Sequence, residues 1–147
     1  MTEAEERAAV ASHLRRTLKE AIAASPDGTP LRFDGTATTM RFTAPADPFL
    51  ETGGWATITL YLQTAADGTL ALAERRQPSR RAPDETRDTT RLLAPVAAVR
   101  FSYASLGADG LPHWRDAWGE SEGVLPGLVR IEVERSPATA ARAASGI

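Results

Sequence analysis

The sequence predicts an α+β domain in which one long N-terminal helix packs on antiparallel sheet. Residues 3–24 carry apolar side chains at every fourth position, which is typical of an amphipathic helix. Residues 55–63 and 128–134 alternate apolar and polar side chains, which is typical of strands wetted on one face. The helical pattern precedes the strand patterns, so the two kinds of element are segregated along the chain. We expect six to eight short strands, in one sheet or in two sheets folded toward a barrel.

Composition restricts the classes of function. The 147 residues, 42% hydrophobic and 24% charged, suit one globular domain, and a net charge of −2 predicts no general affinity for nucleic acid. The absence of cysteine excludes disulfides, thiolate catalysis and cysteine-based zinc sites. Two histidines, His13 and His113, are too few for a histidine-rich metal site.

The predicted helix covers residues 3–24. Thr2 and Glu5 fit a capping box, and Ser-Pro-Asp-Gly at 25–28 ends the helix. The apolar side chains cover an arc of about 120°, and polar side chains occupy the opposite arc. The apolar arc consists of Val10, Ala11, Leu14, Leu18, Ala21 and Ile22, and the polar arc of Ser12, His13, Arg16, Lys19 and Glu20.

The region from 31 to 91 reads as strands, turns and one long loop. Asp34 and Gly35 form a turn signal, and Asp67-Gly68 is a hairpin signal. The expected strands are 31–33, 38–43, 55–63 and 70–76, with a loop over 45–54. Residues 74–91 hold six arginines and four acids, so we expect an exposed loop. The acids and the lack of aromatic residues argue against a phosphate-gripping arm.

Residues 92–134 predict two strands around a loop closed by aromatic residues. Val99, Phe101 and Tyr103 share one face of the first strand, and Val129, Ile131 and Val133 share one face of the second. Between them, a Gly/Asp loop at 107–110 precedes two tryptophans four residues apart, which one helical turn would stack. We expect a structural aromatic cluster that covers the sheet, formed by Phe101, Tyr103, Trp114 and Trp118.

The whole chain predicts one domain over 1–137, with the helix at 3–24 and the β region at 31–134, followed by a flexible tail at 138–147. No cofactor motif is present: no P-loop or dinucleotide fingerprint occurs. A Ser-His-Asp set can be assembled from Ser102 or Ser105 with His113 and Asp116, but no serine lies in a nucleophile elbow. The acids that could hold calcium match no known loop. They are Asp109, Asp116, Glu120 and Glu122.

The order of motifs from 92 to 133 resembles the C-terminal half of the J-type minor pseudopilin of type II secretion systems, general secretion pathway protein J. That order is Leu-Leu, Val-x-Phe-x-Tyr, a Gly/Asp loop, Trp-x-x-x-Trp and Leu-Pro-x-x-Val-x-Ile-x-Val. The resemblance covers residues 70–134 well and the helix-first layout loosely. It implies a pilin-like fold and a non-enzymatic subunit at the tip of the secretion pseudopilus, which initiates the filament that exports folded proteins.

The resemblance also implies partners and a location. The partners would be the I-, K- and H-type minor pseudopilins and the major pseudopilin, met through the outer helix face, with His13, Arg16 and Glu20 as candidate contacts. The domain would lie in the periplasm, anchored in the inner membrane by a methylated N-terminal segment. No run here reaches the roughly 20 apolar residues of a membrane helix, and no signal peptide is present. We expect that this segment has been removed ahead of Met1.

A second class of function stays open. In it, a barrel mouth lined by Tyr61, Trp114 and Trp118 binds a small apolar ligand or a sugar. A pocket of several hundred Å³ under the tryptophans would favour this interpretation.

Overall fold

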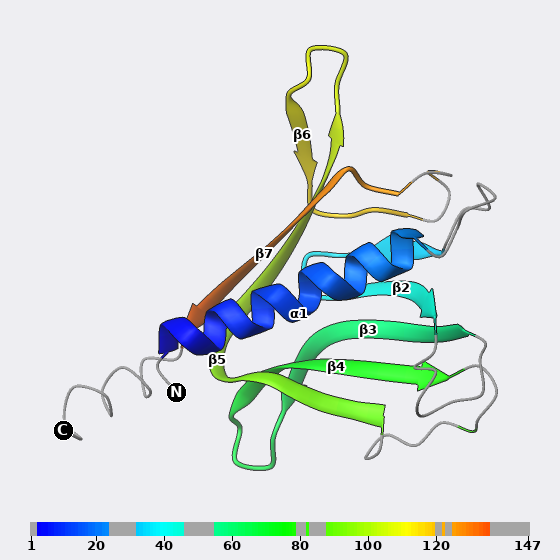
Figure 1. Ribbon diagram of the computed structural model, residues 1–147. Helices are drawn as coiled ribbons and strands as arrows, with labels where there is room; N and C mark the ends of the chain where they lie inside the picture. The colour runs from blue at the N-terminus through cyan, green and yellow to red at the C-terminus, as the bar shows by residue number, and fades with distance from the viewer. Residues whose placement is uncertain are drawn as a thin grey trace.

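The computed structural model describes residues 3–23, 32–45, 55–78, 82, 88–119, 122 and 125–135. Within these ranges, one helix precedes seven strands: α1 (Glu3–Ala23), β1 (Phe33–Gly35), β2 (Met40–Pro45), β3 (Trp55–Thr64), β4 (Leu70–Pro78), β5 (Thr89–Leu106), β6 (Pro112–Arg115) and β7 (Leu128–Arg135). Figure 1 shows α1 lying across the hollow side of a curled antiparallel sheet. The predicted α+β class is therefore confirmed. The expected tail at 138–147, the helix stop at 25–28 and Glu120 lie outside the described residues.

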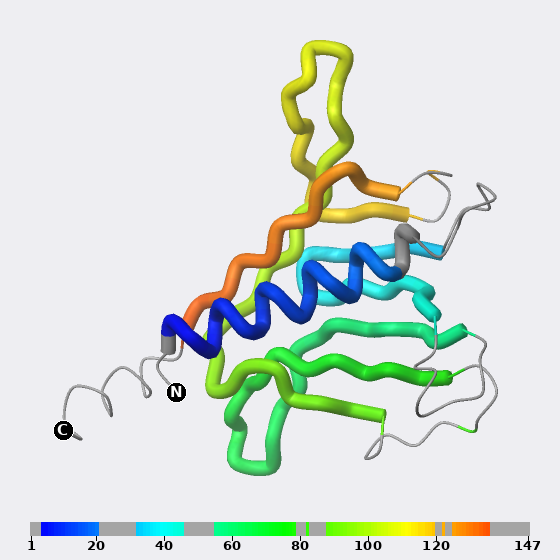
Figure 2. Tube along the Cα trace, in the orientation of Figure 1, coloured from blue at the N-terminus to red at the C-terminus, as the bar shows by residue number. Residues whose placement is uncertain are grey.

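The sheet runs in the order β1-β2-β3-β4-β5-β6, and β7 pairs with β5 as well. The first part of β5 pairs with β4, from Thr89 opposite Arg75 to Val96 opposite Leu70, through register shifts. The last part lies between two other strands, because Tyr103 is paired with Arg115 of β6 and with Val129 of β7. Strand β5 therefore joins the lower and upper halves of the molecule, as the tube in Figure 2 shows.

The curl brings β1 back to the segment that follows β6. Gly35 and Trp118 exchange two backbone hydrogen bonds, of 2.8 and 3.0 Å. The hydroxyl of Tyr103 donates to the carbonyl of Thr36 at 2.9 Å. A Cβ at position 35 would come within 2.0 Å of that hydroxyl oxygen, so only glycine fits here. The result is a curled half-barrel.

The core fills the hollow of this half-barrel. Strand β3 shows the predicted alternation, with Ala56, Ile58 and Leu60 buried and Thr57 exposed. Leu14 of α1 is buried against the sheet, whereas Val10 and Leu18 are only partly buried. The other large buried side chains are Phe33, Met40, Phe42, Leu72, Leu93, Val96, Val99, Phe101, Tyr103 and Trp118.

Several expectations about local structure are wrong. Asp34 and Gly35 belong to β1, and the turn follows them, with Thr36 Oγ1 accepting the backbone N–H groups of Thr38 and Thr39. The stretch expected as a loop over 74–91 contributes 74–78 to β4 and 89–91 to β5. The strand expected around 99–103 is one part of an 18-residue strand.

Candidate functional site

The hairpin formed by the end of β5 and by β6 projects from the body as an arm (Figure 1). Gly110 turns it with a positive φ of 77°. Leu106 and Leu111 on this arm are 60% and 62% exposed. Trp114 on β6 and Leu128 at the start of β7 are also largely exposed. The arm region therefore carries most of the exposed large apolar side chains in the described part of the chain.

Trp114 and Trp118 do not stack on one helical turn, because Trp114 lies in strand β6. The indole of Trp114 is 38% exposed and lies under the guanidinium of Arg130, at 3.9 Å from the ring centroid. Trp118 is 3% exposed and belongs to the core with Phe101 and Tyr103. The expected aromatic cluster is thus confirmed for three of its four members and wrong for Trp114.

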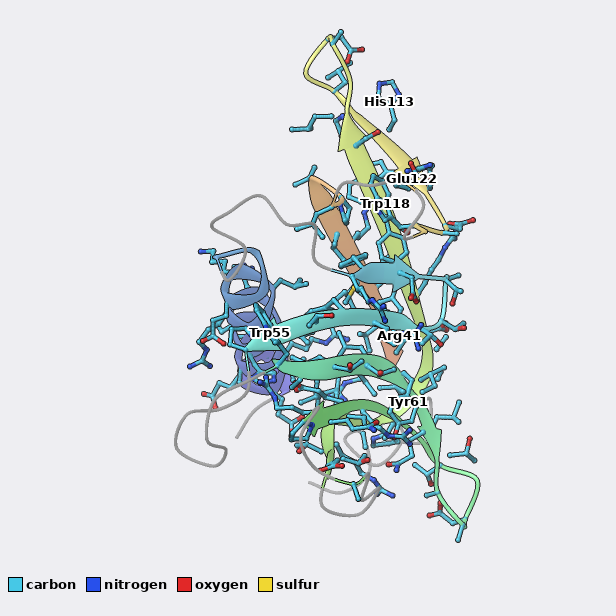
Figure 3. The ribbon with its side chains drawn as sticks, turned by 90° about the vertical axis from the view of Figure 1, so that its right-hand side faces the viewer. Arg41, Trp55, Tyr61, His113, Trp118 and Glu122 are labelled. Atoms are coloured by element: carbon cyan, nitrogen blue, oxygen red, sulfur yellow. The ribbon has the colours of Figure 1, made fainter. Side chains whose placement is uncertain are left out.

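The rings expected to line a ligand-binding mouth lie in different surroundings. Trp118 is in the core, whereas Tyr61 lies on β3 with the guanidinium of Arg75 at 5.4 Å from its centroid. Figure 3 shows Tyr61 and Trp118 well separated along the molecule. These rings therefore do not form one mouth.

Charged pairs stiffen the base of the arm. Arg100 donates to Asp116 at 2.8 Å, and this hydrogen bond raises the pKa of Arg100. Arg115 donates to Glu122 at 2.9 Å, and its guanidinium also covers the ring of Trp118 at 4.3 Å. Each pair is exposed, so it contributes little to stability.

The candidate catalytic residues are not arranged as a triad. His113 stands opposite Ser105 in the β5–β6 register, but its carboxylate neighbour is Asp109 at 3.8 Å. Asp116 is paired with Arg100, and Ser102 is buried on β5. Among the described residues, no group of three or more acidic or histidine side chains could hold a metal ion.

The expected partner contacts on α1 separate into two groups. The side chain of His13 is 35% exposed, and its Nε2 lies 2.5 Å from a carboxylate oxygen of Glu74. That carboxylate lies on the sheet face under the helix, is 6% exposed, and has Arg76 at 3.4 Å on its other oxygen. His13 therefore fastens α1 to β4, while Arg16 and Glu20 are exposed on the outer side of the helix.

Burial and a negative neighbour also change the acidity of Tyr103. Removal from water raises the pKa of its phenol above the usual 10.0, and the nearby charge of Asp34 raises it further. The phenol thus stays a proton donor to the turn between β1 and β2.

An apolar groove runs between α1 and β7. One cavity of about 340 Å³ lies toward the C-terminal half of the helix, and a second of about 380 Å³ lies toward its N-terminal half. Arg15, Leu18 and Val129 line both cavities, so the two cavities adjoin. The first is further lined by Lys19, Phe33, Phe42, Thr43, Leu125, Pro126, Gly127 and Leu128, and the second by Arg7, Val10, Ala11, Leu14, Leu72, Leu93, Ile131 and Val133. We refer to them together as the α1–β7 groove.

Sequence reasoning missed Glu74, Arg15 and Lys19. Glu74 belongs to a polar stretch that predicts a loop. The two cations sit on one flank of a helix, where charged residues are usually just solvated. The signal in the sequence was the spacing of the apolar residues, which predicts an apolar helix face that extends beyond Leu14.

Comparison with known proteins identifies no relative. No family model, no curated protein and no solved structure matches this chain. The described helix is not long and apolar enough to cross a membrane.

Proposed function

We propose that this chain is the globular part of a J-type minor pseudopilin, a non-enzymatic subunit at the tip of a type II secretion pseudopilus. There it assembles with other minor pseudopilins to initiate the filament that exports folded proteins. The domain lies in the periplasm, with an anchor in the inner membrane.

The arrangement of α1 is the observation that carries this proposal. A subunit that assembles through helix faces needs one face bound to its own domain and another left for neighbours. Leu14 is buried against the sheet, and the His13–Glu74 pair fastens the same helix to β4. Arg16 and Glu20 are exposed on the outer side. Figure 3 shows the helix at one margin of the molecule, with the sheet beside it.

The motif order that resembles the J-type family also corresponds to one structural unit. The Val-x-Phe-x-Tyr run of β5 pairs with β7, its tyrosine also pairs with β6, and the second tryptophan is buried in the same core. The Val-x-Ile-x-Val run is β7. These motifs thus interact in space, which supports the use of their order as a signature.

Charge reversal on the outer helix face tests the proposed assembly. The chain is mixed with the purified I- and K-type minor pseudopilins of its own host, and complex formation is followed by size-exclusion chromatography and calorimetry. We expect Arg16→Glu and Glu20→Arg to weaken the complex by at least about tenfold, because a misplaced charge must be desolvated at the interface. Arg91→Glu is the control, since Arg91 is exposed on β5 and bonds to Gln63.

The outcomes separate the interface from the family. Equal affinities for all three variants would show that the interface does not include the outer helix face. No complex of the unaltered chain with either partner would refute the proposed assembly. An independent check is the N-terminal sequence of the protein recovered from host membranes, where we expect a methylated residue followed by about 20 apolar residues.

A further inference from the structure

The apolar stripe of α1 is wider than the surface that the sheet covers. Leu14 is buried, but Val10 and Leu18 on either side of it remain partly exposed. Opposite them, Val129, Ile131 and Val133 of β7 are also only half-buried. Figure 2 shows that α1 and β7 converge near the N-terminus of the helix and diverge toward its C-terminal end. Two apolar rows therefore face each other across the α1–β7 groove.

The size and lining of this groove suit an aliphatic ligand. Its two adjoining cavities, of about 340 and 380 Å³, each reach the size of small-molecule sites. Between Arg7 and Lys19 the helix rises by about 18 Å, at roughly 1.5 Å per residue. Within the described ranges, Thr43 is the only uncharged polar side chain that lines the groove. The lining side chains thus offer few partners to the main-chain amides of a peptide, whose burial without hydrogen bonds is costly.

Two cations border the groove on its helix side. Arg15 and Lys19 lie one helical turn apart on the flank of α1 that faces the cavity, and both line it. Neither has an ion-pair partner within the part of the chain that the structure describes. Among the lining residues that the structure describes, neither cavity has an acidic side chain. An anionic group at this point therefore meets two positively charged side chains next to an apolar groove.

We propose that the α1–β7 groove binds a fatty acid. The carboxylate accepts hydrogen bonds from Arg15 and Lys19, and the guanidinium provides the planar fork that matches a carboxylate. The chain fills the space between Leu18 and Val129 and then extends along β7 toward Ile131. Binding at the groove does not depend on the proposed secretion function.

Calorimetric titration with fatty acids tests the site directly. We expect saturable one-to-one binding of dodecanoate below its micelle concentration. The affinity should rise about fourfold for each methylene added from octanoate to dodecanoate, as expected for a buried chain. Dodecanol should bind at least about tenfold more weakly, since it lacks the charge that Arg15 and Lys19 recognise. In methyl spectra, dodecanoate should shift Ile131 in the groove and leave Ile58, which is in the core, unchanged.

Two variants and one control locate the ligand. The double substitution Arg15→Glu and Lys19→Glu should lower the affinity for dodecanoate by at least about tenfold, and both residues are exposed, so the fold is retained. Val129→Phe should also weaken binding, because it fills the point where the two cavities join. Arg16→Glu reverses one charge on the outer side of the helix, half of the change in the double variant, and should leave the affinity unchanged.

Three results would overturn the proposal. One is a dissociation constant for dodecanoate weaker than about 1 mM. Another is equal binding by the double variant and the Arg16→Glu control. The third is binding to phosphatidylglycerol vesicles without binding to monomeric dodecanoate, which would assign the surface to a lipid bilayer instead.

Discussion

Replacement of Trp118 by alanine should be among the most destabilising single changes in the upper half of the molecule. The indole is 3% exposed and packs in the same core as Phe101 and Tyr103. A buried indole removes about 200 Å² from water, which at about 25 cal/mol per Å² corresponds to roughly 5 kcal/mol. Because the surroundings relax and alanine keeps the backbone pairing with Gly35, we expect a loss of about 3–5 kcal/mol.

The matched control is Trp114→Ala, which removes the same side chain four residues earlier. Trp114 is 38% exposed, and its main partner is the guanidinium of Arg130 at 3.9 Å. An exposed cation–π contact contributes about 0.5–1 kcal/mol, so this variant should lose about 1 kcal/mol. Urea unfolding of both variants, compared with the parent at equal m-values, gives the two free energies. Losses that agree within about 0.5 kcal/mol would refute the different placement of the two rings.

Three further predictions concern polar contacts and close packing. Tyr103→Phe should cost about 1–2 kcal/mol near neutral pH, because the carbonyl of Thr36 loses a donor. Folding raises the pKa of Tyr103 above 10.0, so its contribution to stability is complete below that pH and is lost as the pH rises through the folded-state pKa. The free energy of unfolding, measured by urea melts on both sides of pH 10.0, should therefore fall less steeply with pH for the phenylalanine variant than for the parent. His13→Ala should cost about 2–3 kcal/mol of stability, because it leaves the buried carboxylate of Glu74 with Arg76 as its partner. Glu74→Gln should cost only about 1 kcal/mol, because water can reach the partners that it leaves. The reverse order in urea melts would contradict the burial of Glu74. Gly35→Ala should cost at least about 2 kcal/mol, because its Cβ would overlap Tyr103, whereas Gly127→Ala meets only ordinary contacts of 3.6 Å or more and should change the melting temperature little.

The sequence predicted those helices and strands in which the spacing of apolar side chains matches their burial in the folded chain. The helix at 3–24, the strand at 55–63 and the hairpin at Asp67-Gly68 agree with α1, β3 and the β3–β4 turn. The faces of β7 are also confirmed, with Val129 inward and Arg130 exposed. In each case a continuous pattern of side chains decides between solvent and core, so local sequence is sufficient.

The missed features depend on tertiary partners. Strand β5 runs through Ala94-Pro95, where alternation breaks, because β4 and β7 supply its hydrogen bonds on either side of that point. Glu74 lies in a polar stretch but becomes buried, since His13 and Arg76 satisfy its oxygens. Trp114 and Trp118 have a helical spacing, yet pairing with β5 makes the first of them part of a strand. Local pattern cannot reveal partners that lie 60 residues away.

The α1–β7 groove also depends on tertiary structure, because here residues expected in the core remain partly exposed. The period of α1 predicts an apolar arc of about 120°, and sequence reasoning assigns the whole arc to the core. In the folded chain Leu14 in the middle of this arc is buried, whereas Val10, Ala11 and Leu18 are not, because β7 diverges from the helix and leaves Leu18 and Val129 lining the groove. The apolar face of α1 is wider than the part that the core buries, and it lies beside Arg15 and Lys19, which have no ion-pair partner in the described part of the chain. This combination suits an amphipathic anionic ligand. A charged helix flank and an apolar stripe are each ordinary features, and only the fold shows that they border the same cavity.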